Sequence, residues 1–233
     1  MNEVAFRINV DECGKYLKQL GLLKRENFIN SKNVSESKYS TEFIQESRNG
    51  SYENMYSCAM ENDDYDFLLM DGSFFQFSIC INANEESVRM AFYPSVCKLE
   101  YSQFLIEQLN VKEEDVGAEY LELYEQFIIE QRPNQVTPIR YDYNTHLYKE
   151  IIHSSAHLHI GYEENIRIPI NKKIRPTLFV KFIVEYYYFD LWRNKIKNMD
   201  IDIFYEKKDF EDIERRYFSL KDEMIPFINI VRR

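Results

Sequence analysis

Residues 65–81, YDFLLMDGSFFQFSICI, carry the pattern that decides the fold. Asp71-Gly72 lies between two β-prone runs, and this dipeptide is typical of the two-residue turns that join antiparallel strands. In the second run apolar residues alternate with other residues, as in a strand with one buried face. That face would consist of Phe75, Phe77, Ile79 and Ile81. The same period returns after a turn, in Val88, Met90 and Phe92, so we predict an antiparallel β-meander.

Other segments extend this strand pattern along the chain. Asn49-Gly50, between residues 41–48 and 51–60, predicts a further hairpin, so that residues 41–93 form a strand-rich region. Period-two alternation comes back in residues 137–143 (TPIRYDY) and 156–161 (AHLHIG), which are predicted strands.

Helical signals lie on both sides of these strands. A helix at about 11–20 would begin with Asp11 as N-cap and end before Gly21. Residues 101–131 have helical spacing, and a charged surface helix is expected near 206–218.

Pro176 suits the first turn of a long aromatic helix. Four aromatic residues in this segment have helical spacing, which predicts a core-facing stripe rather than a platform for stacking bases. They are Phe179, Phe182, Tyr186 and Phe189. We therefore predict that residues 1–233 form a single α+β domain, an antiparallel β-meander sheet covered by helices, with the histidine-bearing strands and C-terminal helices at 137–218.

The composition indicates a folded protein with reduced thiols. Hydrophobic residues make up 45% of the chain, which is ample for a packed core and argues against disorder. The four cysteines form no C-x-x-C pair, which favours buried thiols over disulfides or a zinc knuckle. The first twelve residues do not resemble a signal peptide. No run of apolar residues approaches the length of about 20 that a membrane span requires. We expect a soluble cytoplasmic protein that does not bind a membrane.

Charge is unevenly distributed along the chain. The formal net charge of -10 argues against nucleic-acid binding by the whole surface, because phosphate contacts need Lys and Arg. Residues 132–181 nevertheless contain eight Lys or Arg and four Asp or Glu. Candidate substrate-binding residues in this basic stretch are Tyr141, Arg167, Lys172, Lys173 and Arg175. The alternative for the last three is a solvated loop before a helix.

All four histidines of the chain lie in the same basic stretch. They are His146, His153, His157 and His159. Histidine has an unperturbed pKa near neutrality, so such a concentration indicates proton transfer, metal ligation or anion contact. Residues two apart in a strand point the same way, so His157 and His159 would share one face. By the same rule Arg140 would lie beside Asp142, and pairing of the two strands would bring all four groups to one solvent-reachable surface.

Two interpretations make the histidines either acid-base catalysts or metal ligands. In the first, one histidine is a general base and another a general acid in metal-free phosphodiester cleavage. Asp142 would orient an imidazole, and Arg140 with Lys172 or Lys173 would stabilise the phosphorane. In the second, His157 and His159 bind one divalent metal ion. The third ligand would then be Asp142, His146, His153 or Glu163.

Two further interpretations remain. Ser154 or Ser155 would be a nucleophile beside a histidine, although the chain has no G-x-S-x-G elbow. Alternatively the histidines are structural and hold residues 144–154 against the sheet through hydrogen bonds to the backbone.

The C-terminal half carries a resemblance to a known family. The order R-Y-D-Y, a His, H-S-S-A-H-L-H-I-G, R-I-P and a proline-started apolar helix resembles the uncharacterised bacterial family catalogued as domain of unknown function 2290. This resemblance covers most of the chain, is most specific at 138–184, and implies bacterial origin but no activity. Over residues 138–184 the chain is also distantly similar to TumE-like toxins of toxin-antitoxin modules, which lack the region before residue 132. The matching positions are Arg140, Tyr141, Asp142, His157 and His159.

These observations favour a bacterial protein of antiphage-defence or toxin type that cleaves or binds a phosphodiester, with RNA as the preferred substrate and no cofactor. The candidate catalytic residues are His157, His159, Asp142, Arg140, His153 and His146. The alternative is a non-catalytic module whose acidic exterior docks a cognate protein partner and whose histidines are structural.

Overall fold

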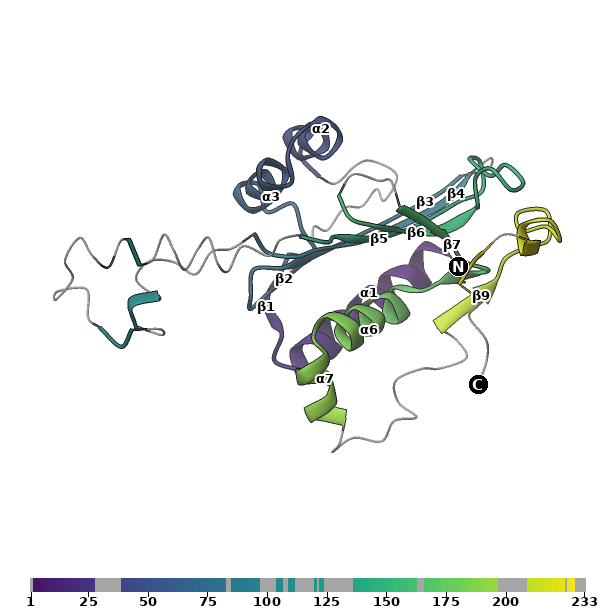
Figure 1. The fold of residues 1–233 in the computed structure, drawn as a ribbon. Helices are drawn as coiled ribbons and strands as arrows, with labels where there is room; N and C mark the ends of the chain where they lie inside the picture. The colour runs from purple at the N-terminus through teal and green to yellow at the C-terminus, as the bar shows by residue number, and fades with distance from the viewer. Residues whose placement is uncertain are drawn as a thin grey trace.

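The fold is built on a sheet whose seven strands lie side by side in chain order. A computed structural model of the chain describes residues 2–27, 39–82, 85–96, 104–106, 109–111, 120, 122–123, 136–162, 166–196, 209–224 and 226–228. The strands are β1 (Leu23–Glu26), β2 (Phe67–Leu69), β3 (Phe74–Ile81), β4 (Glu86–Tyr93), β5 (Ile139–Asn144), β6 (Ala156–Ile160) and β7 (Ile166–Pro169). Each strand pairs antiparallel with the next (Figure 1). The predicted α+β class and antiparallel meander are confirmed.

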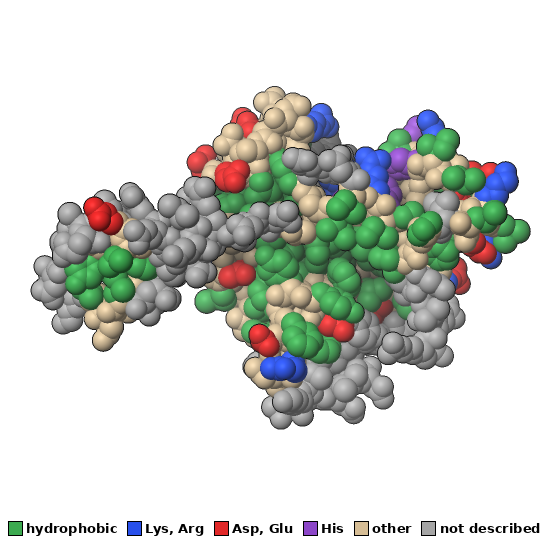
Figure 2. All heavy atoms as spheres, viewed as in Figure 1, with side chains coloured by type: hydrophobic (Ala, Val, Ile, Leu, Met, Phe, Trp, Pro, Cys, Tyr) green, Lys and Arg blue, Asp and Glu red, His purple; other side chains and the backbone are tan. Residues whose placement is uncertain are grey.

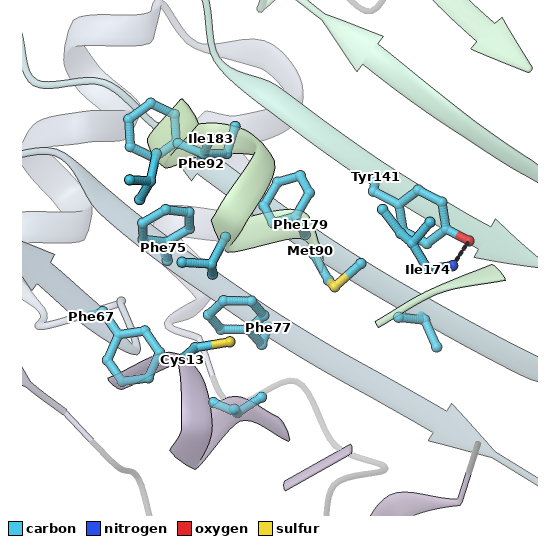
Figure 3. Close-up of a cluster of buried hydrophobic side chains, with 14 of the residues drawn as sticks. Cys13, Phe67, Phe75, Phe77, Met90, Phe92, Tyr141, Ile174, Phe179 and Ile183 are labelled. Carbon is cyan, nitrogen blue, oxygen red and sulfur yellow. Dashed lines mark hydrogen bonds between the residues drawn. The ribbon is translucent and has the colours of Figure 1, made fainter. Parts of the chain in front are cut away.

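Two helices, α1 (Glu3–Gln19) and α6 (Pro176–Tyr187), pack against one face of this sheet (Figure 1). Figure 3 shows Cys13 of α1 and Phe179 and Ile183 of α6 among the side chains of the strands. The strand residues in this main core include Phe75, Phe77, Ile79, Val88, Met90, Phe92 and Tyr141. The alternation predicted for β3 and β4 is therefore confirmed except at Ile81, which ends β3 and is exposed. Pro176 occupies the first turn of α6, where a backbone N–H has no partner within the helix, so its absence in proline costs no hydrogen bond.

The aromatic stripe predicted for this helix is only partly correct. Phe179 is fully buried and Phe182 packs against the core, but Tyr186 is 67% exposed. The helix ends at Tyr187, and Phe189 begins a separate helix, α7 (Phe189–Ile196). The side chains that α6 buries most deeply are the i, i+4 pairs Phe179–Ile183 and Val180–Val184.

The opposite face of the sheet is covered at one end by α2 (Thr41–Asn49) and α3 (Tyr52–Glu61) (Figure 1). These helices form a second core with residues of β2 and β3. Its buried members are Phe43, Tyr52, Met55, Tyr56, Ala59, Tyr65, Leu68 and Phe74.

The hairpin predicted at Asn49-Gly50 is wrong, because helix caps on both sides of this dipeptide decide the local structure. The Ser40 hydroxyl accepts the Phe43 N–H, and the Ser51 hydroxyl accepts the Asn54 N–H. Such caps satisfy backbone donors that a helix start leaves unpaired. Gly50 has extended backbone and not the positive φ of a hairpin turn.

The N-terminal helix is longer than predicted, since it begins at Glu3 with Asn2 as N-cap. The Asn2 side chain accepts the Ala5 N–H at 2.8 Å, so Asp11 lies inside the helix. Gly21, with φ +74°, follows the C-terminal end of the helix as predicted.

The C-terminal region differs more strongly from the prediction. Residues 210–212 form β9 (Phe210–Asp212), which pairs with β8 (Lys172–Ile174), and they are not helical as predicted. Phe210 lies opposite Ile174 and packs against the main core, so the burial of this residue favours a strand over the expected surface helix. A single 3-10 turn, η4 (Asp222–Met224), follows. The predicted helices at 101–131 fall largely outside the described residues. Among the described residues, no helix has both the length and the apolar character to cross a membrane.

Gly72 is required at the β2–β3 turn because of both its backbone angle and its neighbours. Its φ is +84°, and a Cβ at this position would lie 2.7 Å from Ser95 Oγ and 3.0 Å from Tyr56 Oη. We expect Gly72→Ala to lower the free energy of unfolding by about 1–3 kcal/mol, because strain and displaced contacts add. Urea denaturation measures this effect. Gly21→Ala is the matched control, because Gly21 has a similar φ and no atom within 4 Å of the added Cβ. Equal losses in the two variants would show that close approach to Ser95 and Tyr56 contributes nothing.

Candidate functional site

The sheet face that α2 and α3 cover at one end carries a group of charged and imidazole side chains on β4, β5 and β6. Asp142 of β5 lies opposite Arg89 of β4 and His157 of β6. Arg140 lies opposite His159. Cross-strand partners and residues two apart share a face, so these five side chains, the polar cluster, lie together.

Asp142 is at the centre of the polar cluster. Its Oδ1 accepts a hydrogen bond from Arg89 Nε at 2.9 Å, and its Oδ2 accepts one from Arg140 Nε at 3.0 Å. The same Oδ2 lies 3.3 Å from His159 Nε2, which in turn lies 2.9 Å from His157 Nε2. The structure therefore brings together the four residues that the strand pattern placed on one surface.

Exposure to solvent falls along this series of contacts. The Arg89 side chain is 61% exposed and the Asp142 side chain 13%, whereas His159 is 3% and His157 5% exposed. The expectation of solvent-reachable imidazoles is therefore wrong for the two rings themselves. Solvent reaches the polar cluster from its arginine side. In Figure 2 histidine side chains lie beside Lys and Arg side chains at one end of the molecule.

Burial and neighbouring charges set the protonation states. Burial alone would raise the pKa of Asp142. The hydrogen bond from His159 and the charges of Arg89 and Arg140 outweigh this effect, and the pKa lies well below its ordinary value. Burial lowers the pKa of His157 to about 4, and the adjacent His159 adds to this shift. Near neutral pH, Asp142 is thus ionised and His157 is a neutral base or ligand, not a proton donor.

The backbone fixes the tautomer of His157. Its Nδ1 lies 3.2 Å from the Ser154 carbonyl oxygen, which can only accept a hydrogen bond. Nδ1 of the neutral ring therefore carries the proton, and Nε2 presents a lone pair to His159. Asp142, His157 and His159 each offer one ligand atom, and these atoms all lie within 4.8 Å of one another. Two imidazoles and a carboxylate suit a divalent transition-metal ion.

The other two histidines differ from this pair. The His153 ring packs edge-on against His157, with ring centroids 5.2 Å apart. Burial lowers the pKa of His153, and the charge of Arg167 lowers it further. His146 lies in the exposed turn after β5, where its backbone N–H donates to Asn144 Oδ1. His153 thus borders the polar cluster, and His146 does not belong to it.

A buried carboxylate from the C-terminal region holds the turn that carries His146 and His153. Asp222 accepts hydrogen bonds from the Ile151 N–H at 2.8 Å and from the Tyr148 hydroxyl at 2.6 Å. Ile151 has φ +66°, which is rare for a β-branched residue. The bond to Asp222 stabilises this conformation.

Several predicted substrate-binding residues lie on the opposite, helix-covered face. Tyr141 is fully buried in the main core, and its hydroxyl accepts the Ile174 N–H at 3.2 Å (Figure 3). Tyr141 alternates with Arg140 and Asp142 along β5, which explains why it points away from them. The sheet separates Tyr141 from the polar cluster.

The basic residues of β8 are also on the helix-covered face, where they form ion pairs. Lys173 is buried, pairs with Glu86 and lies over the Tyr143 ring. The other two pairs join β8 and its flank to β9; they are Lys172 with Asp212, and Arg175 with Glu211. Lys172 and Arg175 thus tie β8 and its flank to β9, and Lys173 ties β8 to β4 of the main sheet, so all three cations are engaged on the face opposite the histidines. Of the four basic residues predicted to bind substrate, Arg167 alone lies on the face of the polar cluster, opposite His159.

Ser154 and Ser155 do not form a nucleophile-histidine pair. Their hydroxyls donate to the backbone carbonyls of Ala156 and Tyr217, each at 2.7 Å. Sequence reasoning missed Arg89, although its place between Val88 and Met90 put it on the polar face of β4. Residues 94–138 separate β4 from β5, so the pairing that brings Arg89 to Asp142 was not visible in the sequence.

Comparisons with known proteins identify the family. The sequence model of a family described as an uncharacterized conserved protein, DUF2290, matches residues 22–227. No curated protein and no solved structure matches the chain. The distant similarity to TumE-like toxins is therefore not shown. Because the matched segment spans most of the chain, the protein belongs to the DUF2290 family of uncharacterized conserved proteins.

Proposed function

We propose that this protein hydrolyses phosphodiester bonds, with RNA as its substrate class, and that the polar cluster is its reaction centre. The observation that carries the proposal is the meeting of Asp142, His157 and His159 on a sheet face whose neighbouring long side chains are arginines.

The arginines are suited to bind the phosphate. The polar cluster and its neighbour Arg167 are locally basic, although the whole chain has a net charge of -10. Arg89, Arg140 and Arg167 lie on this face, and Asp142 is the carboxylate of the cluster. Guanidinium groups bind phosphate oxygens in a planar, two-point geometry and stabilise the charge of a phosphorane. Arg89 engages Asp142 through Nε and is largely exposed, so its terminal nitrogens are available to a phosphate.

The imidazole pair and Asp142 would activate the attacking oxygen. Asp142 contacts His159, and His159 contacts His157, so the three groups form one continuous network. A base or ligand held in place by a further group is the common arrangement in nucleophile activation. RNA is the substrate to assay first, because its 2′-hydroxyl supplies an attacking oxygen beside the phosphorus. That attack would form a 2′,3′-cyclic phosphate and release the 5′-hydroxyl of the next nucleotide, and water would then open the cyclic ester to complete the hydrolysis.

A nuclease assay on single-stranded RNA tests the proposal. Wild-type protein should cleave the RNA, and the His157→Ala/His159→Ala double variant should be at least about 100-fold slower, since loss of acid-base catalysis has this size. His146→Ala is the matched control and should cleave at the wild-type rate. Circular dichroism and thermal denaturation show whether each variant is folded. Equal rates for the wild type and a folded double variant, or no cleavage by the wild type with and without divalent metal, would refute the proposal.

The burial of both rings favours a second candidate function, a non-catalytic module that docks a cognate protein partner. In this case the histidines stabilise the fold, and the double variant would have a lower Tm while the wild type shows no turnover. A partner recovered with the wild type, together with no cleavage of RNA, would support this candidate.

A further inference from the structure

We propose that Asp142, His157 and His159 bind one divalent transition-metal ion. The inference rests on the positions of three ligand atoms. The catalytic role of the ion rests on the proposed function, whereas ion binding itself does not.

The spacing of the ligand atoms fits a shared ion. His159 Nε2 lies 2.9 Å from His157 Nε2 and 3.3 Å from Asp142 Oδ2. Two atoms that each lie about 2.0–2.1 Å from one metal ion are about 2.9 Å apart at a right angle and about 3.4 Å apart at the tetrahedral angle. Both observed distances fall in this range, and all three ligand atoms lie within 4.8 Å of one another. His159 is therefore already placed to share an ion with each of the other two ligands.

The three ligand atoms have too few protons between them for each contact to be a full hydrogen bond. The Nδ1 proton of the neutral His157 ring points to the Ser154 carbonyl, so His157 Nε2 has a lone pair. The Asp142 carboxylate also only accepts. A single proton on His159 Nε2 must then serve two acceptors, at 2.9 and 3.3 Å. A cation at the same place satisfies all three ligand atoms.

The surroundings orient two of the three ligands, His157 and Asp142, as outer groups do at known metal sites, whereas His159 Nδ1 is buried without a hydrogen-bond partner among the described residues. His157 is held through Nδ1 by a backbone carbonyl, and both oxygens of Asp142 accept hydrogen bonds from arginines. Metal-ligating histidines and carboxylates are usually held in this way by their other polar atoms. The ligands come from β5 and β6, inside the seven-stranded sheet, so their backbone is fixed on both sides.

Charge and ligand type select the kind of ion. Arg89 and Arg140 oppose a cation beside Asp142, so binding should be weaker than at sites made of several anionic ligands. Each carboxylate oxygen has two lone pairs, so Oδ2 can keep Arg140 and still ligate. Imidazole nitrogens favour Zn²⁺ or Co²⁺ over Mg²⁺ and Ca²⁺, which prefer oxygen ligands.

Three protein ligands leave a position open for an oxygen of water or substrate. The ion would lower the pKa of the attacking oxygen beside the phosphate-binding arginines. That oxygen would give its proton to water and form the new bond to phosphorus, the bond from phosphorus to the leaving sugar oxygen would break, and the leaving oxygen would take a proton from water.

Metal titration of the full chain tests the inference. Purified protein, stripped with a chelator and dialysed, is titrated with Zn²⁺ by calorimetry and with Co²⁺ by visible absorption. We expect about one ion per chain, and binding at least about 100-fold weaker in His159→Ala and Asp142→Ala. His146→Ala, which removes an exposed imidazole outside the cluster, should bind like the wild type. Excess Mg²⁺ should not displace Zn²⁺.

A measurement on the wild type keeps the test independent of variant folding. Crystals soaked in Zn²⁺ should show an anomalous peak about 2.0–2.2 Å from the three ligand atoms. A peak only at His146, no bound ion, or wild-type affinity in a folded His159→Ala variant would overturn the inference. RNA cleavage by protein free of metal would overturn the catalytic role of the ion and leave the proposed function standing. An ion bound at the three ligand atoms without RNA cleavage would leave the metal site standing and refute the proposed function.

Discussion

Phe179→Ala is expected to lower the free energy of unfolding by about 3–5 kcal/mol, the usual cost of removing a large aromatic side chain from a core. Phe179 is fully buried where α6 meets the sheet, and its ring packs edge-on against Phe75 with centroids 6.3 Å apart (Figure 3). The truncation would leave a cavity between two rigid layers that cannot easily collapse. Urea denaturation with an unchanged m-value measures the loss.

Tyr186→Ala on the same helix is the matched control. Tyr186 is 67% exposed, so its truncation should change the free energy of unfolding by no more than about 0.5 kcal/mol. A cost for Phe179→Ala similar to that of Tyr186→Ala would mean that α6 does not pack on the sheet as described.

These two residues show where helical periodicity stops being informative. Phe179 and Tyr186 have equivalent helical spacing in the sequence, and both were predicted to face the core. Spacing defines a stripe on a helix but not where the helix ends or how far the sheet extends beneath it. Both properties depend on tertiary structure. In the structure α6 ends at Tyr187, one residue after Tyr186.

The two Gly turns show a related limit. Asp71-Gly72 lies in a true hairpin connection between β2 and β3, but not as the predicted two-residue turn. The Gly72 N–H donates to the Leu69 carbonyl, so Met70 and Asp71 are the central residues of the turn, and Gly72 has the positive φ. Asn49-Gly50 has the same turn chemistry, yet it joins two helices capped by Ser40 and Ser51. Serine caps with apolar residues at helical spacing outweighed the dipeptide, and both signals were present in the sequence.

The polar cluster was predictable in part. Alternation placed His157 with His159 and Arg140 with Asp142, and only the pairing of β5 with β6 was needed to join them. Arg89 required knowledge of a pairing across a long intervening segment. The lysines of β8 were assigned to the histidines because they are near in sequence and basic. The chain turns to the other side of the sheet between β7 and β8, and a run of charges does not reveal such a turn.

Glu86→Ala is expected to lower the free energy of unfolding by about 3 kcal/mol, because it removes the carboxylate that forms the ion pair with the buried Lys173 ammonium, although the charge of Glu211 remains. The Lys173 side chain is 5% exposed, whereas that of Glu86 is 30% exposed. Lys173→Met should therefore cost much less, about 1 kcal/mol, since water can solvate the remaining carboxylate. The Glu86→Ala/Lys173→Met double variant should recover most of the loss.

The pH dependence of the free energy of unfolding provides a second test of the difference between Glu86→Ala and Lys173→Met. Burial lowers the pKa of Lys173 in the folded protein below that of the unfolded chain. Between these two pKa values the unfolded state binds more protons, so stability must rise with pH. The rise should be steeper in Glu86→Ala than in the wild type and absent in variants with Met at position 173. Urea denaturation at a series of alkaline pH values measures it. Equal costs for Glu86→Ala and Lys173→Met, with parallel pH profiles, would show that Lys173 is solvated.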